Sequence, residues 1–161
     1  QATRAIGLSE GPVHAELRIN NDGPWVIEVA GRSIGGLCSR TLQFGLGISL
    51  EVLILRQALR LDIDTLEQCG QASGAMMMPI PEGGMFERIE GVEVARQVEG
   101  IENMVITAIK GEILKPLPEG GGYPGFLFAR GPAPDFVEQA LRNAYDCLRL
   151  RVKEELPLIK S

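Results

Sequence analysis

Residues 13–29 alternate apolar and polar side chains on both sides of a short turn sequence, and this pattern constrains the fold more than any other. Alternation with a period of two is typical of a half-buried β-strand. The turn sequence is Asn21-Asp22-Gly23, in which Gly23 suits a left-handed backbone conformation. We therefore predict two antiparallel strands joined by a three-residue hairpin loop, with one apolar face and one polar face.

Centring this hairpin on Asp22 determines which residues lie opposite each other. On the polar face Glu16 is directly opposite Glu28, because a slip of one residue would oppose apolar to polar side chains along the whole ladder. Directly opposed like charges destabilise a sheet by about 0.2–1 kcal/mol. The chain must therefore tolerate this repulsion or supply a cation. The apolar face is predicted to contain three pairs: Ile19 with Trp25, Leu17 with Ile27, and Ala15 with Val29.

The residues alone leave two interpretations of the opposed glutamates open. Carboxylate oxygens together with phosphate are suited to bind a hard divalent ion such as Mg²⁺. Alternatively, Arg18 or Arg32 neutralises the pair on a solvated sheet face. Arg32 follows Glu28 by four residues, where its guanidinium is also suited to bind a carboxylate or phosphate of a ligand. His14 shares the polar face with Glu16, and we interpret it first as a structural side chain and second as a positioning one.

Composition and charge exclude several functional classes. Of the 161 residues 45% are apolar and 23% charged, which is typical of a globular protein. The formal charge of −5 argues against a nucleic-acid or membrane-surface binder, because both require a basic face. No apolar run could span a bilayer and no signal-peptide pattern opens the chain, so we expect a cytoplasmic protein. Cys38, Cys69 and Cys147 are too widely spaced for a disulfide framework or a zinc knuckle.

Two features indicate that the chain is part of a longer protein. It begins with Gln1, and residues 1–8 have the pattern of a helix that started earlier. It contains only four lysines, all in its second half: Lys110, Lys115, Lys153 and Lys160. We therefore expect a missing N-terminal part.

Residues 47–61 are predicted to form a helix, because apolar side chains recur there at helical spacing. Ser49 is the predicted N-cap of this helix. The predicted apolar stripe contains Leu50, Leu53, Ile54, Ala58 and Leu61. Residues 62–73 are polar and small, which indicates a domain boundary near residue 68.

After this boundary the pattern changes to short strands. They are predicted in residues 74–81, 82–91 and 125–131, and on both sides of a tight Lys110-Gly111 turn within 103–117. A closing helix is predicted from about Pro134 to Val152, with proline in its first turn. Several antiparallel strands with a closing helix make this part α+β.

Three further motifs have structural interpretations. The Met76-Met77-Met78 run lies in a predicted strand and is interpreted as core. The glycine-rich segment at 118–125 lacks the lysine and following Ser or Thr of a P-loop, so we interpret it as a surface loop near an active cleft. Arg130, at the end of its strand, is predicted to be solvated.

Residues 11–36 resemble the last part of the ATP-grasp fold. In that family one strand carries a glutamate and the next carries a glutamate-x-x-x-arginine, which matches Glu16, Glu28 and Arg32. The resemblance implies that both glutamates hold Mg²⁺ (or Mn²⁺) on the phosphates of ATP, and that Arg32 orients the acyl phosphate or the substrate carboxylate. Substrate contacts are expected from Arg32 and three further residues: His14, Gly35 and Gly36.

Residues 74–151 resemble the C-terminal domain of L-amino-acid ligases and related carboxylate–amine ligases. The segments MMMPIP, GGMFERIEG and KGEILKPLPEGGGYPGFLFARG occur in the order found in that family. The two resemblances imply an α+β chain in three parts. Residues 1–68 would be the C-terminal half of an ATP-grasp domain, 69–154 a small antiparallel-sheet domain with a closing helix, and 155–161 a tail.

The implied activity is an ATP-dependent carboxylate–amine ligase that forms an acyl phosphate from a small carboxylate or amino acid. The family's glycine-rich lid and ATP-contacting lysines would lie before Gln1, so the isolated chain is expected to be inactive. Ala30 departs from the family, because many members have an asparagine there that supplies an oxygen ligand. Two alternatives stay open: an interaction or homodimerisation module that has lost catalysis, and an ATP-grasp carboxylase of the biotin carboxylase or carbamoyl-phosphate synthetase type.

Overall fold

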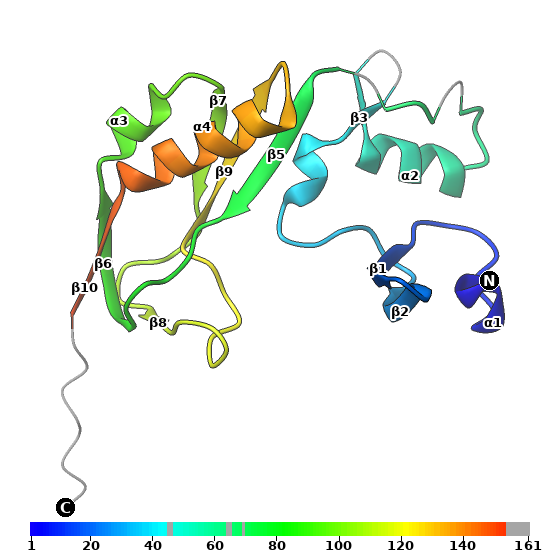
Figure 1. Cartoon of the computed structure of the whole chain (residues 1–161), viewed down its shortest axis with the longest axis horizontal. Helices are drawn as coiled ribbons and strands as arrows, with labels where there is room; N and C mark the ends of the chain where they lie inside the picture. The colour runs from blue at the N-terminus through cyan, green and yellow to red at the C-terminus, as the bar shows by residue number, and fades with distance from the viewer. Residues whose placement is uncertain (45–46, 64–65, 69, 154–161) are drawn as a thin grey trace, which may run out of the picture. The chain divides into compact units, whose positions relative to one another are not determined.

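A computed structural model describes residues 1–44, 47–63, 66–68 and 70–153 (Figure 1). The chain divides into two units, Gln1–Gly70 and Gln71–Ser161, and each is described here by itself. Both contain antiparallel strands and helices, which confirms the predicted α+β class. Residues 64–65, Cys69 and the predicted tail at 155–161 lie outside the described residues. None of the described helices is both long enough and apolar enough to cross a membrane.

Unit 1 begins with a short helix, α1 (Ala2–Ala5), followed by the predicted hairpin of β1 (His14–Asn20) and β2 (Gly23–Ala30). The opposition of Glu16 and Glu28 is confirmed, and so is that of Ala15 and Val29. Nearer the turn the predicted register is wrong, because Ile27 is an extra residue in β2 that forms a β-bulge. The observed pairs beyond the bulge are Leu17 with Val26, Arg18 with Trp25, and Ile19 with Pro24.

The Asn20 side chain explains why the turn differs from the prediction. Its Oδ1 accepts hydrogen bonds from the backbone N–H of Asp22 at 2.9 Å and from Nε1 of Trp25 at 3.1 Å. Asn20 therefore pairs directly with Gly23, whose φ is 117°, and the loop has two residues instead of three. The bulge compensates for the shorter loop, so that the glutamates still meet.

The rest of unit 1 contains a 3₁₀ helix, η1 (Cys38–Thr41), two short paired strands, β3 (Gln43–Phe44) and β4 (Ile48–Ser49), and helix α2 (Leu50–Ala58). Ser49 caps α2 as predicted, because its hydroxyl accepts from the N–H of Val52 at 3.4 Å. The helix ends early, since Arg60 has a left-handed φ of 55° and the N–H of Leu61 donates back to the carbonyl of Arg56.

The predicted apolar stripe of α2 is therefore only partly correct. Leu53 is buried, and Leu50 and Ile54 are half-buried. Ala58 and Leu61 are exposed, because the chain turns away before they can complete the stripe.

Unit 2 contains two three-stranded antiparallel sheets. The first has the order β5 (Ala72–Met77), β9 (Gly125–Gly131), β7 (Ile101–Ile106). The second has the order β10 (Arg149–Lys153), β6 (Gly84–Glu90), β8 (Ile113–Leu114). Helix α4 (Pro134–Asp146) covers the first sheet, and a short helix, α3 (Val92–Arg96), which was not predicted, follows β6.

Two predictions for unit 2 are wrong. The strands on either side of the Lys110-Gly111 turn do not pair, because the turn docks on Phe86, whose carbonyl accepts from Gly111 N–H and whose N–H donates to the Glu112 carbonyl. The closing helix starts at Pro134 as predicted but ends at Asp146. The residues that follow form β10, since their alternating side chains pair with β6.

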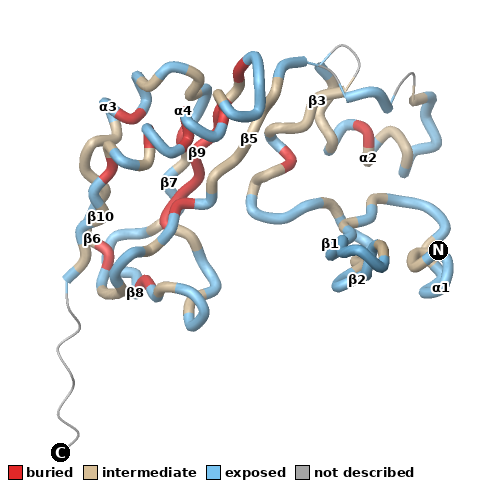
Figure 2. The backbone as a smooth tube through the Cα atoms, in the orientation of Figure 1, coloured by how far each residue is buried: buried red, intermediate tan, exposed pale blue. Residues whose placement is uncertain are grey.

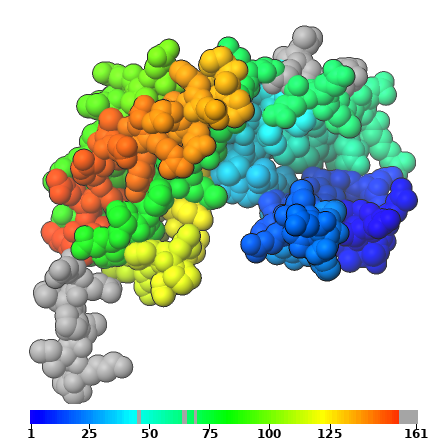
Figure 3. All heavy atoms as spheres, in the orientation of Figure 1, coloured from blue at the N-terminus to red at the C-terminus, as the bar shows by residue number. Residues whose placement is uncertain are grey.

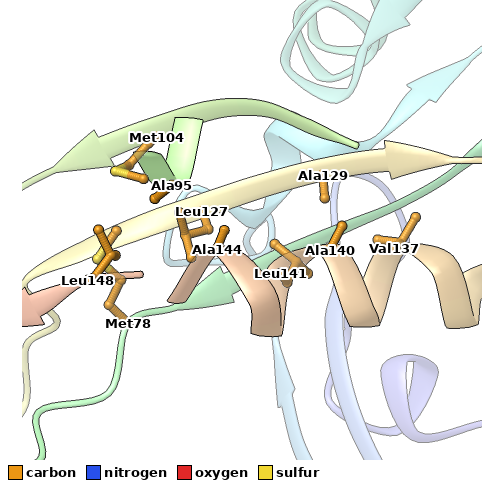
Figure 4. Packing of buried hydrophobic residues seen from close by; sticks show 10 residues of the cluster. All are labelled: Met78, Ala95, Met104, Leu127, Ala129, Val137, Ala140, Leu141, Ala144 and Leu148. Atoms are coloured by element: carbon orange, nitrogen blue, oxygen red, sulfur yellow. The ribbon is translucent and has the colours of Figure 1, made fainter. Parts of the chain in front are cut away.

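The core of unit 2 lies between α4 and the β5–β9–β7 sheet, where buried residues concentrate (Figure 2). Leu127 and Ala129 of β9 point toward Ala140 and Ala144 of α4 (Figure 4). Gly74 allows this close packing, because a Cβ there would lie 2.9 Å from Cγ1 of Val137.

The interpretations of the methionine run and of Arg130 have mixed outcomes. Met78 is fully buried and Met76 packs against the core, whereas Met77 is exposed. Arg130 is not solvated as predicted: its side chain is 15% exposed and Nε donates to Oε1 of Glu102 at 2.7 Å.

A charged network crosses the β6–β10 pair. Glu90 Oε2 accepts from Nε of Arg151 at 2.8 Å, and Oε1 accepts from Nη2 of Arg88 at 2.6 Å. The hydrogen bonds from Arg151 and then Arg88 hold the pKa of Glu90 below the ordinary glutamate value. A carboxylate with a lowered folded-state pKa contributes stability above its unfolded-state pKa, and this contribution is lost as pH falls through the folded-state pKa.

We expect Leu127→Ala to lower the free energy of unfolding of unit 2 by about 2–5 kcal/mol, because it opens a cavity at a fully buried position in β9. Urea denaturation followed by circular dichroism measures the change. Val94→Ala, at a side chain that is 59% exposed, is the control and should change stability by no more than about 0.5 kcal/mol. Equal effects of the two substitutions would contradict the assigned core.

We expect Arg151→Gln to raise the pKa of Glu90 toward its ordinary value, since the largest stabiliser of the ionised carboxylate is removed. An NMR titration of the Glu90 side-chain carboxyl carbon measures this shift. Arg142→Gln should leave Glu90 unchanged, because Arg142 pairs with Glu138 on α4. An unchanged Glu90 titration in Arg151→Gln would show that the bridge across β6 and β10 does not form in solution.

Candidate functional site

The two glutamates of the hairpin form the centre of the candidate site. Glu16 on β1 and Glu28 on β2 are direct cross-strand partners and both are exposed to solvent. Side chains at directly opposed positions have Cβ atoms about 4.5–5.5 Å apart. The two carboxylates therefore lie on one face of the hairpin, above the bulge and away from the turn.

Arg32 lies beside this pair, because the chain turns sharply after β2. The N–H of Arg32 donates to the carbonyl of Ala30 at 2.9 Å, which directs the side chain back toward the strand. Nη2 of Arg32 then donates to Oε1 of Glu28 at 3.2 Å, and Nη1 donates to the carbonyl of Ser33 at 3.1 Å. The side chains of Arg32 and Glu28 remain about half exposed, so the ion pair is open to exchange with a ligand.

Glu16 has no hydrogen-bond or ion-pair partner among the described residues. Within the described residues Arg18 forms no ion pair with either glutamate, and of the two glutamates Arg32 pairs only with Glu28. The repulsion between the carboxylates is therefore only partly compensated by protein cations, and one acidic group remains available to a ligand.

Of the other predicted site residues, His14 lies on the hairpin with the carboxylates, and Gly35 and Gly36 lie in the loop that follows it. His14 is half-buried on the same face as Glu16 and directly opposite Ala30. Gly35 and Gly36 form the turn into η1, where the carbonyl of Gly35 accepts from the N–H of Cys38 at 3.2 Å. No hydrogen bond within the described residues joins either glycine to Glu16 or Glu28. A Cβ on Gly35 would contact nothing within 4 Å, so the loop is open there.

The donor set restricts which metal the site could hold. Within the described residues no group of three or more His, Cys, Asp or Glu side chains is arranged to bind an ion. A site formed by the protein alone, such as a structural zinc or calcium site, would need more ligands than the pair provides. Two carboxylates do fit Mg²⁺, which is commonly held by one or two carboxylates together with substrate phosphates and water.

Sequence analysis missed a polar contact that connects η1 with α2. A hydrogen bond from the side chain of Ser39 is the largest cause that lowers the pKa of Glu51, with smaller contributions from its backbone, Ser49 and Arg40. Ser39 is buried, and Glu51 lies in the first turn of α2. The signal in the sequence was Ser49-x-Glu51 at the helix start, which marks a cap but does not identify Ser39 as a partner.

The glycine-rich loop of unit 2, which connects β8 to β9, lines a cavity of about 430 Å³ together with β8. Lys115, Glu119 and Tyr123 are among the residues that line this cavity. Figure 3 shows the loop (yellow) at the surface of unit 2, as the sequence predicts. Its expected position near an active cleft stays a prediction.

Comparison with known proteins connects this geometry with a family. Residues 1–41 match the ATP-grasp domain, and residues 76–153 match the L-amino acid ligase C-terminal domain 2. The chain is therefore similar to ATP-grasp ligases in two successive segments. The opposed glutamates and Arg32 all lie within the segment that matches the ATP-grasp domain.

Solved structures of ligases share the fold of nearly the whole chain. The L-amino acid ligase from Bacillus licheniformis superimposes with a TM-score of 0.77 and 29% identity, covering 95% of this chain and 39% of that one. The N5-carboxyaminoimidazole ribonucleotide synthetase from Thermotoga maritima has a TM-score of 0.70 and 16% identity, covering 94% and 40%.

One curated relative, the uncharacterized protein y4rH of Sinorhizobium fredii, is 22% identical over 148 residues, or 90% of this chain and 30% of the relative. The chain therefore spans less than half the length of the ligases and of the curated protein that it resembles.

We expect Glu16→Gln to stabilise the metal-free hairpin by about 0.2–1 kcal/mol, because it removes the opposed charge that lacks a partner. Urea unfolding followed by the fluorescence of Trp25, the single tryptophan, measures the change. Glu28→Gln should gain less, since it also loses the ion pair with Arg32. Destabilisation by Glu16→Gln would contradict the uncompensated repulsion.

Proposed function

We propose that this chain is the C-terminal part of an ATP-dependent carboxylate–amine ligase that works through an acyl phosphate. The observation that carries the proposal is the direct opposition of Glu16 and Glu28 in a segment that matches the ATP-grasp domain. Opposed carboxylates cost stability in the free protein, and a bound cation removes this cost. A role in cation binding would therefore explain why the chain contains this pair.

Glu16 and Glu28 would hold Mg²⁺ or Mn²⁺ on the phosphates of ATP. When bound, the ion neutralises the charge of the phosphoryl group that is transferred. Arg32 would orient the substrate carboxylate and then the acyl phosphate, because a guanidinium binds both groups with two parallel hydrogen bonds. Its exposed ion pair with Glu28 keeps it at the edge of the carboxylates until a substrate replaces that contact.

The remaining predicted residues would bound the substrate. Gly35 leaves the loop after β2 open, and Gly36 follows it with a left-handed φ of 63°, so a substrate would approach the backbone here. His14 would position the substrate from the same face as Glu16.

The proposed reaction has two steps. A carboxylate oxygen of the substrate bonds to the γ-phosphorus of ATP while the bond from that phosphorus to ADP breaks. The nitrogen of an amine then bonds to the acyl carbon, phosphate leaves with the electrons of the carbon–oxygen bond, and the nitrogen loses a proton. Orientation and charge neutralisation supply most of the catalysis in such transfers, which is consistent with a site made of two carboxylates and a guanidinium.

We further propose that an N-terminal part of the same protein supplies the lid and the lysines that contact ATP. The sequence has no lysine before Lys110, so residues 1–68, the proposed half of the ATP-grasp domain, bring none of their own. Residues 69–154 would be the ligase-type C-terminal domain. Cys38 and Cys147 are free thiols, which is consistent with the reducing cytoplasm where we place the protein.

We expect Glu16→Gln and Glu28→Gln, made in the complete ligase polypeptide, each to lower ATP- and amine-dependent phosphate release at least about 100-fold, as loss of a charge-stabilising group does. A coupled assay of phosphate release at saturating Mg²⁺ measures this. Glu10→Gln, at an exposed glutamate outside the hairpin, is the matched control and should retain activity. Turnover that survives both substitutions, or ATP turnover by residues 1–161 alone, would refute the proposal.

A second candidate is an interaction module that derives from an ATP-grasp ligase and has lost catalysis. Ala30 favours it, because this residue lies opposite His14 beside the carboxylates and offers no side-chain oxygen to a metal. The same glutamine substitutions separate the two functions. A module of this kind would show no turnover in the complete polypeptide and would bind its partner equally well with either glutamate replaced.

A further inference from the structure

The cavity beside the glycine-rich loop of unit 2 is lined by charged residues that the proposed reaction does not use. Its volume of about 430 Å³ is within the range of small-molecule sites. Lys115, Glu112 and Glu119 line it together with the glycines of the loop. All of its lining residues belong to unit 2. The cavity is therefore a candidate for a second binding site.

Two opposite charges in the wall of this cavity lack partners within the protein. Among the described residues, neither Lys115 nor Glu119 forms a hydrogen bond or an ion pair, either with each other or with a third residue. Glu112 differs, because its Oε2 accepts from the N–H of Ile109 at 3.1 Å. A cation and an anion that line one cavity without pairing are complementary to a small molecule that carries both a carboxylate and an ammonium.

The three glycines of the loop are retained for different reasons. A Cβ on Gly120 would clash with the carbonyl of Lys115, so close packing requires glycine there. A Cβ on Gly121 or Gly122 would meet nothing within 4 Å, and neither residue has the left-handed φ that favours glycine. The fold therefore does not require these two glycines. A backbone without side chains does allow a ligand to approach the loop closely.

A smaller cavity adjoins the first and has no charged residue in its wall. Its volume is about 190 Å³. It shares three lining residues with the larger cavity, Ile80, Gly122 and Tyr123, and its others are Pro79, Pro116 and Leu117. A ligand with its charged groups in the larger cavity would therefore place an apolar side chain in the smaller one.

The loop between the two cavities is fixed at both of its ends. At one end the N–H of Gly120 donates to the carbonyl of Pro116 at 2.9 Å. At the other end the hydroxyl of Thr107 donates to the carbonyl of Tyr123 at 2.8 Å. The ring of Tyr123 also packs against the buried Phe126, with centroids 6.3 Å apart. A wall that is ordered before the ligand arrives lowers the entropy cost of binding.

We propose that the two cavities bind a small zwitterion with an apolar side chain, namely an apolar α-amino acid or a short peptide of such residues. Lys115 pairs with its carboxylate and Glu119 with its ammonium. This ligand class contains substrates and products of the proposed ligase, so a role of the site in that reaction rests on the proposed function. Binding itself does not, because it requires neither Glu16 nor Glu28.

The test is an NMR titration of ¹⁵N-labelled residues 1–161 with L-leucine and, separately, with L-leucyl-L-leucine, in the absence of ATP and Mg²⁺. Both should shift the backbone amide signals of Gly121 and Gly122, and the one that binds more tightly distinguishes an amino-acid site from a peptide site. N-acetyl-L-leucine lacks the ammonium and L-leucinamide lacks the carboxylate. Each should bind about tenfold more weakly than L-leucine, because a hydrogen bond to a charged group is lost.

Substitutions assign the binding to particular residues. Lys115→Gln and Glu119→Gln should each weaken L-leucine binding about tenfold, and the protein should stay folded because both side chains are exposed. Lys110→Gln and Glu93→Gln are the matched controls at exposed residues outside both cavities, and they should leave the affinity unchanged. Gly122→Leu fills space that is open in the free protein, so it should block the ligand without disturbing the core.

Three outcomes would overturn the inference. The absence of amide shifts at Gly121 and Gly122 at any soluble ligand concentration would show that the cavities do not bind zwitterions. Binding of N-acetyl-L-leucine and L-leucinamide as tight as that of L-leucine would exclude recognition of the two charges. Unchanged affinity in both Lys115→Gln and Glu119→Gln would place the ligand elsewhere. Failure of the ligase proposal is distinguishable, because it would appear as turnover that survives Glu16→Gln and would leave these titrations as expected.

Discussion

The apolar layer between α4 and the β5–β9–β7 sheet is the interaction on which the arrangement of unit 2 depends. β9 is central in that sheet, and its inward side chains meet Ala140 and Ala144 on the helix. The layer also fixes what lies beyond it: the hydroxyl of Tyr145 donates to the carbonyl of Pro79, and the chain leaves α4 in the position from which β10 pairs with β6. Positions around the second sheet therefore follow from burial in the first.

Unit 1 is organised in the opposite way, because its charged site rests on local contacts and most of its large apolar side chains are exposed. The cross-strand pair of glutamates depends on backbone hydrogen bonds within one hairpin, and Arg32 is directed by a single tight turn. Such a site can be assembled locally.

The sequence allowed prediction of features that are set by near neighbours. The Ser49 cap and the start of α4 at Pro134 follow from local chemistry, and the Glu16–Glu28 pair follows from alternation. Features that depend on distant partners were missed. β10 continued a helical spacing through Leu148, yet pairing with β6 decided its structure. The turn at Lys110-Gly111 was recognised, but its docking on Phe86 has no local signal.

The extra residue in β2 divides the hairpin into two lengths with independent pleats. Toward Ala30 the strands keep the alternation that aligns the carboxylates. Toward the tip the phase of the alternation is shifted, and Nε1 of Trp25 donates to Oδ1 of Asn20. A change in loop length or in tip sequence can therefore be absorbed at Ile27 before it reaches the acidic pair. Substitutions at the tip of the hairpin are therefore expected to leave the geometry of the acidic pair at its base unchanged.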